Sequence, residues 1–188
     1  MPATDPLRTI RVDLPREPYD VTIGPGVLDR LDGTAQQLVP LAGRALLVFD
    51  DNLPDETVTR ARASLESIGL RVHDAPVRAL ETNKTLRTLE ELLVRAETCG
   101  LDRGDLFVAL GGGIVGDVAG FAAATHRRGI AVIQCPTTLL AMVDASVGGK
   151  TGVNLDVDGA LRKNAVGAFW QPRVVVADTR TLASLPTR

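Results

Sequence analysis

The sequence is poor in aromatic residues and cysteine and has no excess of positive charge. Aromatic side chains make up 3% of its 188 residues and the formal net charge is −2, which favours neither stacking on single-stranded bases nor attraction to a polyanion. The two cysteines, Cys99 and Cys135, lack the spacing of a disulfide scaffold or a zinc ribbon. No run approaches the roughly 20 apolar residues of a membrane span, and the first residues lack a signal-peptide pattern. We expect a cytoplasmic globular domain without a nucleic-acid or membrane partner.

Lysine is also rare. Of the 21 basic residues only Lys84, Lys150 and Lys163 are lysine, and the rest are arginine. A lysine ammonium is a compact point charge that suits phosphate, whereas a guanidinium is a rigid fork. Chance explains three isolated lysines equally well, so composition alone marks them only as candidates.

Short apolar runs alternate with helical stretches along the chain. This order is typical of βαβ units and predicts one α/β domain, a mostly parallel sheet flanked by helices with a Rossmann-like nucleotide-binding fold. The expected strands lie at residues 9–14, 19–23, 45–49, 70–77, 106–110, 130–135 and 174–177, and the expected helices at 27–39, 54–69, 85–97 and 118–126.

A glycine-rich turn follows the expected strand at 106–110. The string Gly111-Gly-Gly-Ile-Val-Gly-Asp117 contains G-x-G-x-x-G, and backbone N–H groups at such a turn can hold a pyrophosphate. The dinucleotide fingerprint also needs an acidic residue about 20 positions later, and residues 133–136 contain none. The ribose must therefore be held from elsewhere, or the turn binds no ligand.

Polar residues stand out in three further segments. Thr137 and Thr138 follow an expected strand, where ligands bind in open α/β sheets, and Asp144 and Lys150 lie in an apolar stretch, either as site residues or as an ordinary ion pair. Gly149-Lys150-Thr151 matches the end of a Walker A motif, but Asp144 occupies the position of its first glycine. By themselves, Lys163-Asn164 is typical of a loop and residues 81–84 of a helix N-terminus.

Taken in order, these segments resemble the 3-dehydroquinate synthase family. The resemblance covers essentially the whole chain, which corresponds to the N-terminal half of the family's usual length. The strings that carry it are Ala109–Gly113, Gly116–Phe121, Pro136–Leu140, Val147–Thr151, Lys163-Asn164, Gly167–Phe169, Gln171-Pro172 and Leu185-Pro186.

The resemblance implies that the chain binds NAD. Asp50 and Asn52 would hold the adenosine ribose and so supply the carboxylate that the glycine turn lacks. The other implied cofactor contacts are Glu81, Lys84, Gly112, Gly113, Ile114, Val115, Gly116, Asp117, Thr137, Thr138, Lys150, Lys163, Thr181, Leu182 and Ser184.

The resemblance also implies a sugar phosphate substrate and a reaction. Asp144, Lys150, Lys163 and Asn164 would face the substrate, and Arg128 would reach the phosphate site of the neighbouring subunit in a homodimer. The family converts 3-deoxy-arabino-heptulosonate 7-phosphate to 3-dehydroquinate and phosphate in the shikimate pathway, using NAD and a divalent metal, zinc or cobalt.

Three features depart from the family pattern. Ala79-Leu80 replace an Asp-Gly before Glu81, and residues 155–162 form a connector about four residues longer than usual, which can move Lys163 and Asn164 relative to Lys150. The family's metal ligands, a glutamate and two histidines, belong to a helical C-terminal half. We expect no metal ligand here, so that residues 1–188 are an NAD-binding domain, inactive alone.

Two alternatives stay open. One is a related sugar phosphate cyclase, a 2-deoxy-scyllo-inosose or 2-epi-5-epi-valiolone synthase, although the strings 147–151 and 169–172 favour 3-dehydroquinate synthase. The other is a stand-alone nucleotide-binding domain without catalytic activity.

Overall fold

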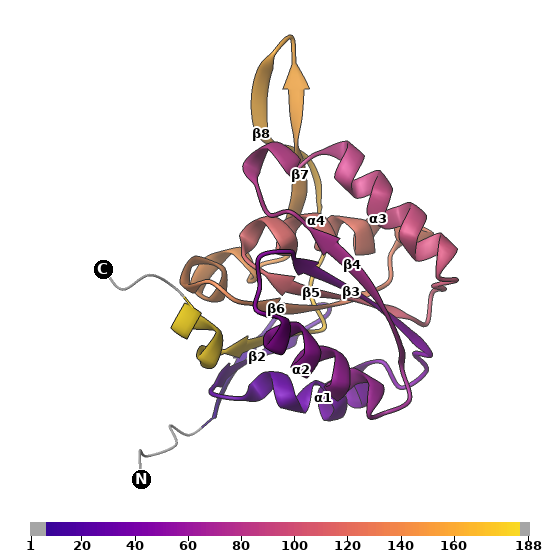
Figure 1. Ribbon diagram of the computed structural model, residues 1–188, viewed down its shortest axis with the longest axis vertical. Helices are drawn as coiled ribbons and strands as arrows, with labels where there is room; N and C mark the ends of the chain where they lie inside the picture. The colour runs from indigo at the N-terminus through magenta and orange to yellow at the C-terminus, as the bar shows by residue number, and fades with distance from the viewer. Residues whose placement is uncertain (1–6, 185–188) are drawn as a thin grey trace.

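The computed structural model describes residues 7–184, whose strands form a seven-stranded sheet and a separate two-stranded hairpin (Figure 1). The order in the large sheet is β1-β2-β9-β6-β5-β3-β4, and every neighbouring pair except β1–β2 is parallel. The strands are β1 (Arg8–Val12), β2 (Tyr19–Gly24), β3 (Arg44–Asp50), β4 (Arg71–Val77), β5 (Leu106–Gly111), β6 (Ala131–Pro136), β7 (Lys150–Val157), β8 (Ala160–Phe169) and β9 (Val174–Asp178).

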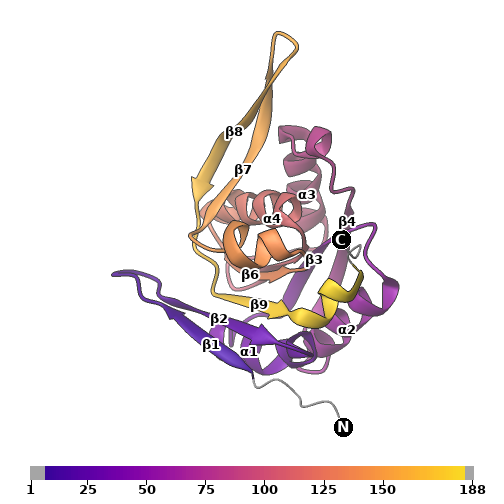
Figure 2. The same ribbon diagram turned by 90° about the vertical axis from the view of Figure 1, so that its left-hand side faces the viewer.

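Helices cover both faces of this sheet (Figure 2). α1 (Leu31–Leu38) and α2 (Asp55–Glu66) pack on one face, and α3 (Leu86–Thr98) and α4 (Gly113–Thr125) pack on the other. The central strands are therefore buried on both sides, which is why they read as unbroken apolar runs. Five short helical turns complete the elements: η1 (Val27–Arg30), η2 (Glu81–Asn83), η3 (His126–Arg128), η4 (Ala141–Ala145) and η5 (Thr179–Ser184).

The predicted fold class is confirmed, and the strands of the large sheet lie within about two residues of their expected bounds. Two local predictions are wrong. Helix α4 begins at Gly113 and not at residue 118. Lys163 and Asn164 lie in strand β8 and not in a loop.

The β7–β8 hairpin stands away from the sheet and crosses helix α4 at its base (Figure 1). A Cβ atom on Gly120 of α4 would lie 2.5 Å from Cγ2 of Thr151 on β7, so only glycine allows the two backbones to approach this closely. Most of β8 is exposed. The hairpin therefore lacks the alternating apolar pattern that would have predicted it.

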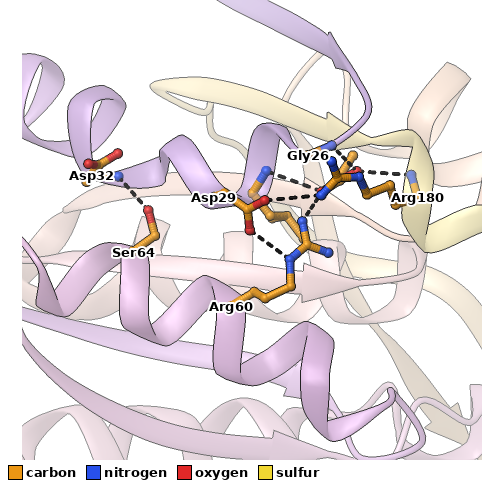
Figure 3. Close-up of polar contacts among 8 residues, drawn as sticks. Gly26, Asp29, Asp32, Arg60, Ser64 and Arg180 are labelled. Carbon is orange, nitrogen blue, oxygen red and sulfur yellow. Dashed lines mark hydrogen bonds and ion pairs between the residues drawn. The ribbon is translucent and has the colours of Figure 1, made fainter. Parts of the chain in front are cut away.

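A buried carboxylate joins the end of the sheet to the helices below it. Asp178, the last residue of β9, is almost fully buried. Its carboxylate accepts hydrogen bonds from the backbone N–H groups of Gly26 at 2.8 Å, Leu28 at 3.4 Å and Arg180 at 3.0 Å. It also accepts from Nη2 of Arg60 on α2 at 2.8 Å. Nε of Arg60 also donates to Asp29 at 2.7 Å, and this bond lowers the pKa of Asp29 (Figure 3).

We predict that Asp178→Ala lowers the free energy of unfolding by about 3 kcal/mol, because it leaves Nη2 of Arg60 and three backbone N–H groups without their acceptor. Urea unfolding followed by circular dichroism measures the loss. The matched control is Asp20→Ala, which removes an exposed ion pair with Arg11 and should cost less than about 1 kcal/mol. Equal losses in the two variants would contradict the role of Asp178.

Candidate functional site

The candidate site lies at the carboxyl ends of β3 and β5. The connection that leaves β3 runs through α2 on one face of the sheet, and the connection that leaves β5 runs through α4 on the other face. Ligands of open α/β sheets bind at such a change of direction. The structure brings three predicted groups to this edge: Asp50 ends β3, the glycine turn follows β5, and Thr137 follows β6, with its N–H donating to Gly111 O at 2.9 Å.

The glycine turn exposes the start of helix α4 to a ligand. No side chain caps this end of the 13-residue helix within the described part of the chain, so the first N–H groups, those of Gly113, Ile114 and Val115, lack intrahelical acceptors. A Cβ atom on Gly113 would lie 3.1 Å from that of Ala145. The turn thus offers bare backbone donors and the positive end of a helix, which fit the pyrophosphate of a dinucleotide.

The predicted ribose pair is preorganised beside this turn. The backbone N–H and Nδ2 of Asn52 both donate to Oδ1 of Asp50 at 3.0 Å, which fixes the Asp50 carboxylate at the end of β3. A cavity of about 360 Å³ lies between the start of α2 and η5 and is lined by Pro54, Thr57 and Thr181, among others.

The other predicted cofactor contacts in the turns after β6 and β9 differ in their burial and in their hydrogen bonds. Thr181 is buried and its hydroxyl donates to Asp178 O at 2.7 Å, while Leu182 is half-buried in the same turn. Thr138 is half-buried and its hydroxyl accepts from the N–H of Ala141 at 3.3 Å. The side chain of Ser184 and the Leu185-Pro186 string lie outside the described residues.

A lysine cluster, formed by Lys84, Asp117 and Asn164, lies under the hairpin. Lys84 is only 5% exposed, and its ammonium donates to the Asp117 carboxylate and to Oδ1 of Asn164. Burial raises the pKa of Asp117 even though Lys84 acts in the opposite direction. These residues come from the end of η2, the first turns of α4 and strand β8. The family resemblance implied that all three serve one site, but no local pattern predicted their mutual contacts.

Glu81 and Lys163 form a second polar group next to the lysine cluster, with 3.7 Å between Oε2 and Nζ. Nδ2 of Asn154 donates to Oε1 of Glu81 at 2.8 Å, and this bond is the main reason that the pKa of Glu81 is lowered. Asn154 itself was not predicted. Its only signal in the sequence is its place three residues after the Gly149-Lys150-Thr151 string.

Lys150 and Asp144 form the exposed ion pair that was the alternative expectation, at 2.7 Å. The hydrogen bond to Asp144 raises the pKa of Lys150. Both residues line a cavity of about 550 Å³ that is also lined by Asp117 and Asn164. The ion pair and the lysine cluster therefore face one open cavity beside the start of α4, which is large enough for a small anionic ligand.

Known proteins share the sequence pattern and the fold of this chain. The family described as 3-dehydroquinate synthase N-terminal matches residues 74–188, which is more than half of the chain. The chain belongs to the 3-dehydroquinate synthase family. It is 46% identical over 177 residues to the 3-dehydroquinate synthase of Symbiobacterium thermophilum and 48% identical over 191 residues to that of Synechococcus sp. strain CC9605.

These matches cover 94% and 100% of this chain but only 48% and 50% of the two relatives. The chain thus spans about half the length of the curated relatives it matches. A crystal structure of 2-deoxy-scyllo-inosose synthase, complexed with carbaglucose-6-phosphate, NAD⁺ and Co²⁺, is also similar. It superimposes with a TM-score of 0.86 at 34% identity, over 95% of this chain and 47% of that one.

The long connector of this 3-dehydroquinate synthase family member lies beyond the site. Val153 pairs with Val166 and Leu155 with Arg162, so that three residues of β8 oppose Asn154 alone in a bulge. Residues 155–162 extend the hairpin past this bulge. Between Lys150 and the bulge the pairing is regular, so residues 155–162 form the tip of the hairpin and not its base.

The other departure from the family pattern is also accommodated. Leu80, which stands in place of the family's glycine, has extended backbone angles, and the N–H of Asn83 still donates to its carbonyl at 2.8 Å. The η2 turn therefore forms without a glycine, and it carries Glu81 and Lys84 to the hairpin base.

Arg128 does not join the site. It lies in η3, at the opposite end of α4 from the glycine turn, and is exposed with a positive φ of 67°. Within residues 7–184 there is no group of three His, Cys, Asp or Glu side chains placed to hold a metal ion. Of the two histidines, His126 is buried and its Nε2 lies 3.1 Å from Leu101 O. None of the described helices has the length and apolar character needed to cross a membrane.

We predict that removing Asp156, Val157, Ala160 and Leu161 together leaves the site intact. These residues form two cross-strand pairs, so their loss moves the Asp158-Gly159 turn onto the next pair without changing the register. The free energy of unfolding should change by less than about 0.5 kcal/mol, as measured by urea unfolding. NMR should show unchanged shifts for Lys84 and Asn164, and large shifts there would show that the tip supports the site.

Proposed function

We propose that this chain is the NAD-binding part of a 3-dehydroquinate synthase, which converts 3-deoxy-arabino-heptulosonate 7-phosphate to 3-dehydroquinate and phosphate. The observation that carries the proposal is the convergence of the glycine turn, the Asp50–Asn52 pair and the lysine cluster at one edge of the sheet, in a member of this family. The residues present suit a dinucleotide beside an anionic substrate.

The cofactor would lie across the carboxyl ends of β3 and β5. The N–H groups of Gly113 to Val115 would hold its pyrophosphate, Asp50 would accept from the ribose hydroxyls, and Thr181 and Leu182 would line the adenosine end. When bound, NAD⁺ would supply a hydride acceptor beside the substrate. The half-buried Asp50 is already oriented by Asn52, so little ordering accompanies binding.

The substrate would occupy the cavity between η4 and the hairpin. Lys150 and Lys163 would hold its carboxylate or phosphate as point charges, and Asn164 and Asp144 would orient its hydroxyl groups. Arg128, far from this cavity, would serve the phosphate site of a second subunit in a homodimer.

The metal-binding part of the enzyme would be a helical domain that is not among residues 1–188. This proposal is supported by the twofold greater length of the relatives. The inosose synthase relative was crystallised with both NAD⁺ and Co²⁺, which supports the same cofactor pair for the whole enzyme. Alone, the chain would bind NAD⁺ without turnover.

A related cyclase is the second candidate function. The observation that favours it is the TM-score of 0.86 to 2-deoxy-scyllo-inosose synthase. Sequence identity favours the first candidate, because it is 46% and 48% to two 3-dehydroquinate synthases and 34% to this cyclase.

The proposal is tested by joining the chain to the remaining half of the Symbiobacterium relative and measuring phosphate release. We expect NAD⁺-dependent release from 3-deoxy-arabino-heptulosonate 7-phosphate by the fusion and none by the chain alone. Glucose 6-phosphate, which resembles the ligand of the inosose synthase structure, tests the second candidate. Phosphate release from glucose 6-phosphate but not from 3-deoxy-arabino-heptulosonate 7-phosphate would assign the chain to the second class. Steady phosphate release by the unfused chain would contradict the proposal that the metal ligands lie outside residues 1–188.

We predict that Asp50→Ala raises the dissociation constant of NAD⁺ for this chain about 10- to 150-fold, which corresponds to about 1.5–3 kcal/mol for a charged hydrogen bond. Isothermal titration calorimetry measures the change. The matched control is Asp51→Ala, which removes the adjacent exposed carboxylate, bonded to Nδ2 of Asn52. We expect the control to bind NAD⁺ as the unmodified chain does. If Asp50→Ala also binds NAD⁺ with unchanged affinity, the ribose assignment is wrong.

A further inference from the structure

We infer that Asn154 is the positioning residue of the lysine cluster: it holds η2 and the β8 bulge together so that Lys84 and Asn164 meet at the cofactor site. The inference deepens the proposed function and rests on it. Asn154 makes no contact with the proposed ligands and acts through the residues that do.

Asn154 is 2% exposed and makes bonds to two segments that are far apart in sequence. Toward η2, its backbone N–H donates to Lys84 O at 2.8 Å, and its Nδ2 donates to Glu81 O at 3.1 Å and to Glu81 Oε1 at 2.8 Å. Toward β8, its Oδ1 accepts from the N–H of Asn164 at 2.9 Å. All the hydrogen-bonding atoms of its side chain and its N–H are therefore engaged.

The bulge explains why a side chain is needed at this point. Lys163, Asn164 and Ala165 oppose one residue of β7, so the regular ladder cannot supply all their backbone partners. Asn164 also has a positive φ of 52°, a conformation that asparagine tolerates but that needs support from its surroundings. The carbonyl oxygen of the Asn154 side chain replaces the missing ladder acceptor.

The same side chain orients the η2 turn. Glu81 begins and Lys84 follows a turn of only three residues, which is too short to hold its shape by helical bonds. The carbonyl group and the carboxylate of Glu81 accept from the side chain of Asn154, and the carbonyl group of Lys84 accepts from its backbone N–H. Without these bonds, the Lys84 ammonium and the Asn164 amide have no shared support, and their contact beside Asp117 loosens.

The first test is Asn154→Ala, with two measurements on this chain. We expect the Asn164 amide proton to exchange with solvent about tenfold faster, and the dissociation constant of NAD⁺ to rise about tenfold, which corresponds to the loss of one or two hydrogen bonds. The Val108 amide in the middle of β5 reports on the core and should keep its exchange rate. The matched control, Asn83→Ala, removes a single bond from the same turn to Arg78 O and should change both quantities by less than about twofold.

The second test separates positioning from general stability. Asn154→Asp keeps the acceptor for the N–H of Asn164 but places one carboxylate against another, that of Glu81. Adding Glu81→Gln restores a hydrogen bond between the two side chains, in which residue 81 now donates and residue 154 accepts. We expect NAD⁺ affinity to fall about tenfold in Asn154→Asp and to be at least partly restored in the double variant, relative to Glu81→Gln alone. Unchanged affinity and unchanged Asn164 exchange in a folded Asn154→Ala variant would overturn the inference, as would the lack of any rescue. If the unmodified chain does not bind NAD⁺, the proposed function fails, and the amide exchange alone decides the role of Asn154.

Discussion

The site depends on how closely helix α4 can pack between the sheet and the β7–β8 hairpin. This helix is buried on nearly all sides, and its small residues allow the contact. A Cβ atom on Gly116 would lie 2.8 Å from Oε1 of Gln134 on β6, and one on Gly120 would meet Thr151 on β7. Larger residues would push the helix away from both neighbours. The hairpin would then move away from the start of α4, and the cavity between them would lose its shape.

Close packing of α4 also gives its first turns two electrostatic roles. The N–H groups at its start carry partial positive charge that favours a pyrophosphate. One turn later, Asp117 extends its carboxylate to Lys84. The buried ammonium therefore has a counter-ion on the same helix that provides the anion site. Because a buried charge without a partner is costly, the Asp117 carboxylate offsets the burial of the Lys84 ammonium, which is only 5% exposed.

The sequence predicts the parts of the fold whose local pattern and final environment agree. Strands β5 and β6 are buried on both faces, so their continuous apolar runs identify them. Helix α4 was expected five residues too late because Gly111 to Gly116 resemble a loop, and packing between sheet and hairpin overrides their low helix propensity. The hairpin was missed because strand β8 is mostly exposed and β7 is buried only in its middle, so neither strand is apolar along its whole length. The role of Asn154 was missed for a related reason, since it depends on a bulge whose register no local pattern reveals.

The geometry of the site gives a physical reason for lysine, and not arginine, at the three lysine positions. Lys84 fits between Asp117 and Asn164 because an ammonium is compact and can direct its three donors to partners on different sides, which a planar guanidinium cannot do in the same space. Lys150 and Lys163 reach the same region from β7 and from the β8 bulge and pair with Asp144 and Glu81. Arginine supplies the other ion pairs, such as Arg60 with Asp178, where two donors in one plane meet two carboxylates. Arginine and lysine thus differ in placement: the Arg60 fork joins helix α2 to the end of the sheet, and the three lysines lie at the base of the hairpin, each beside a carboxylate.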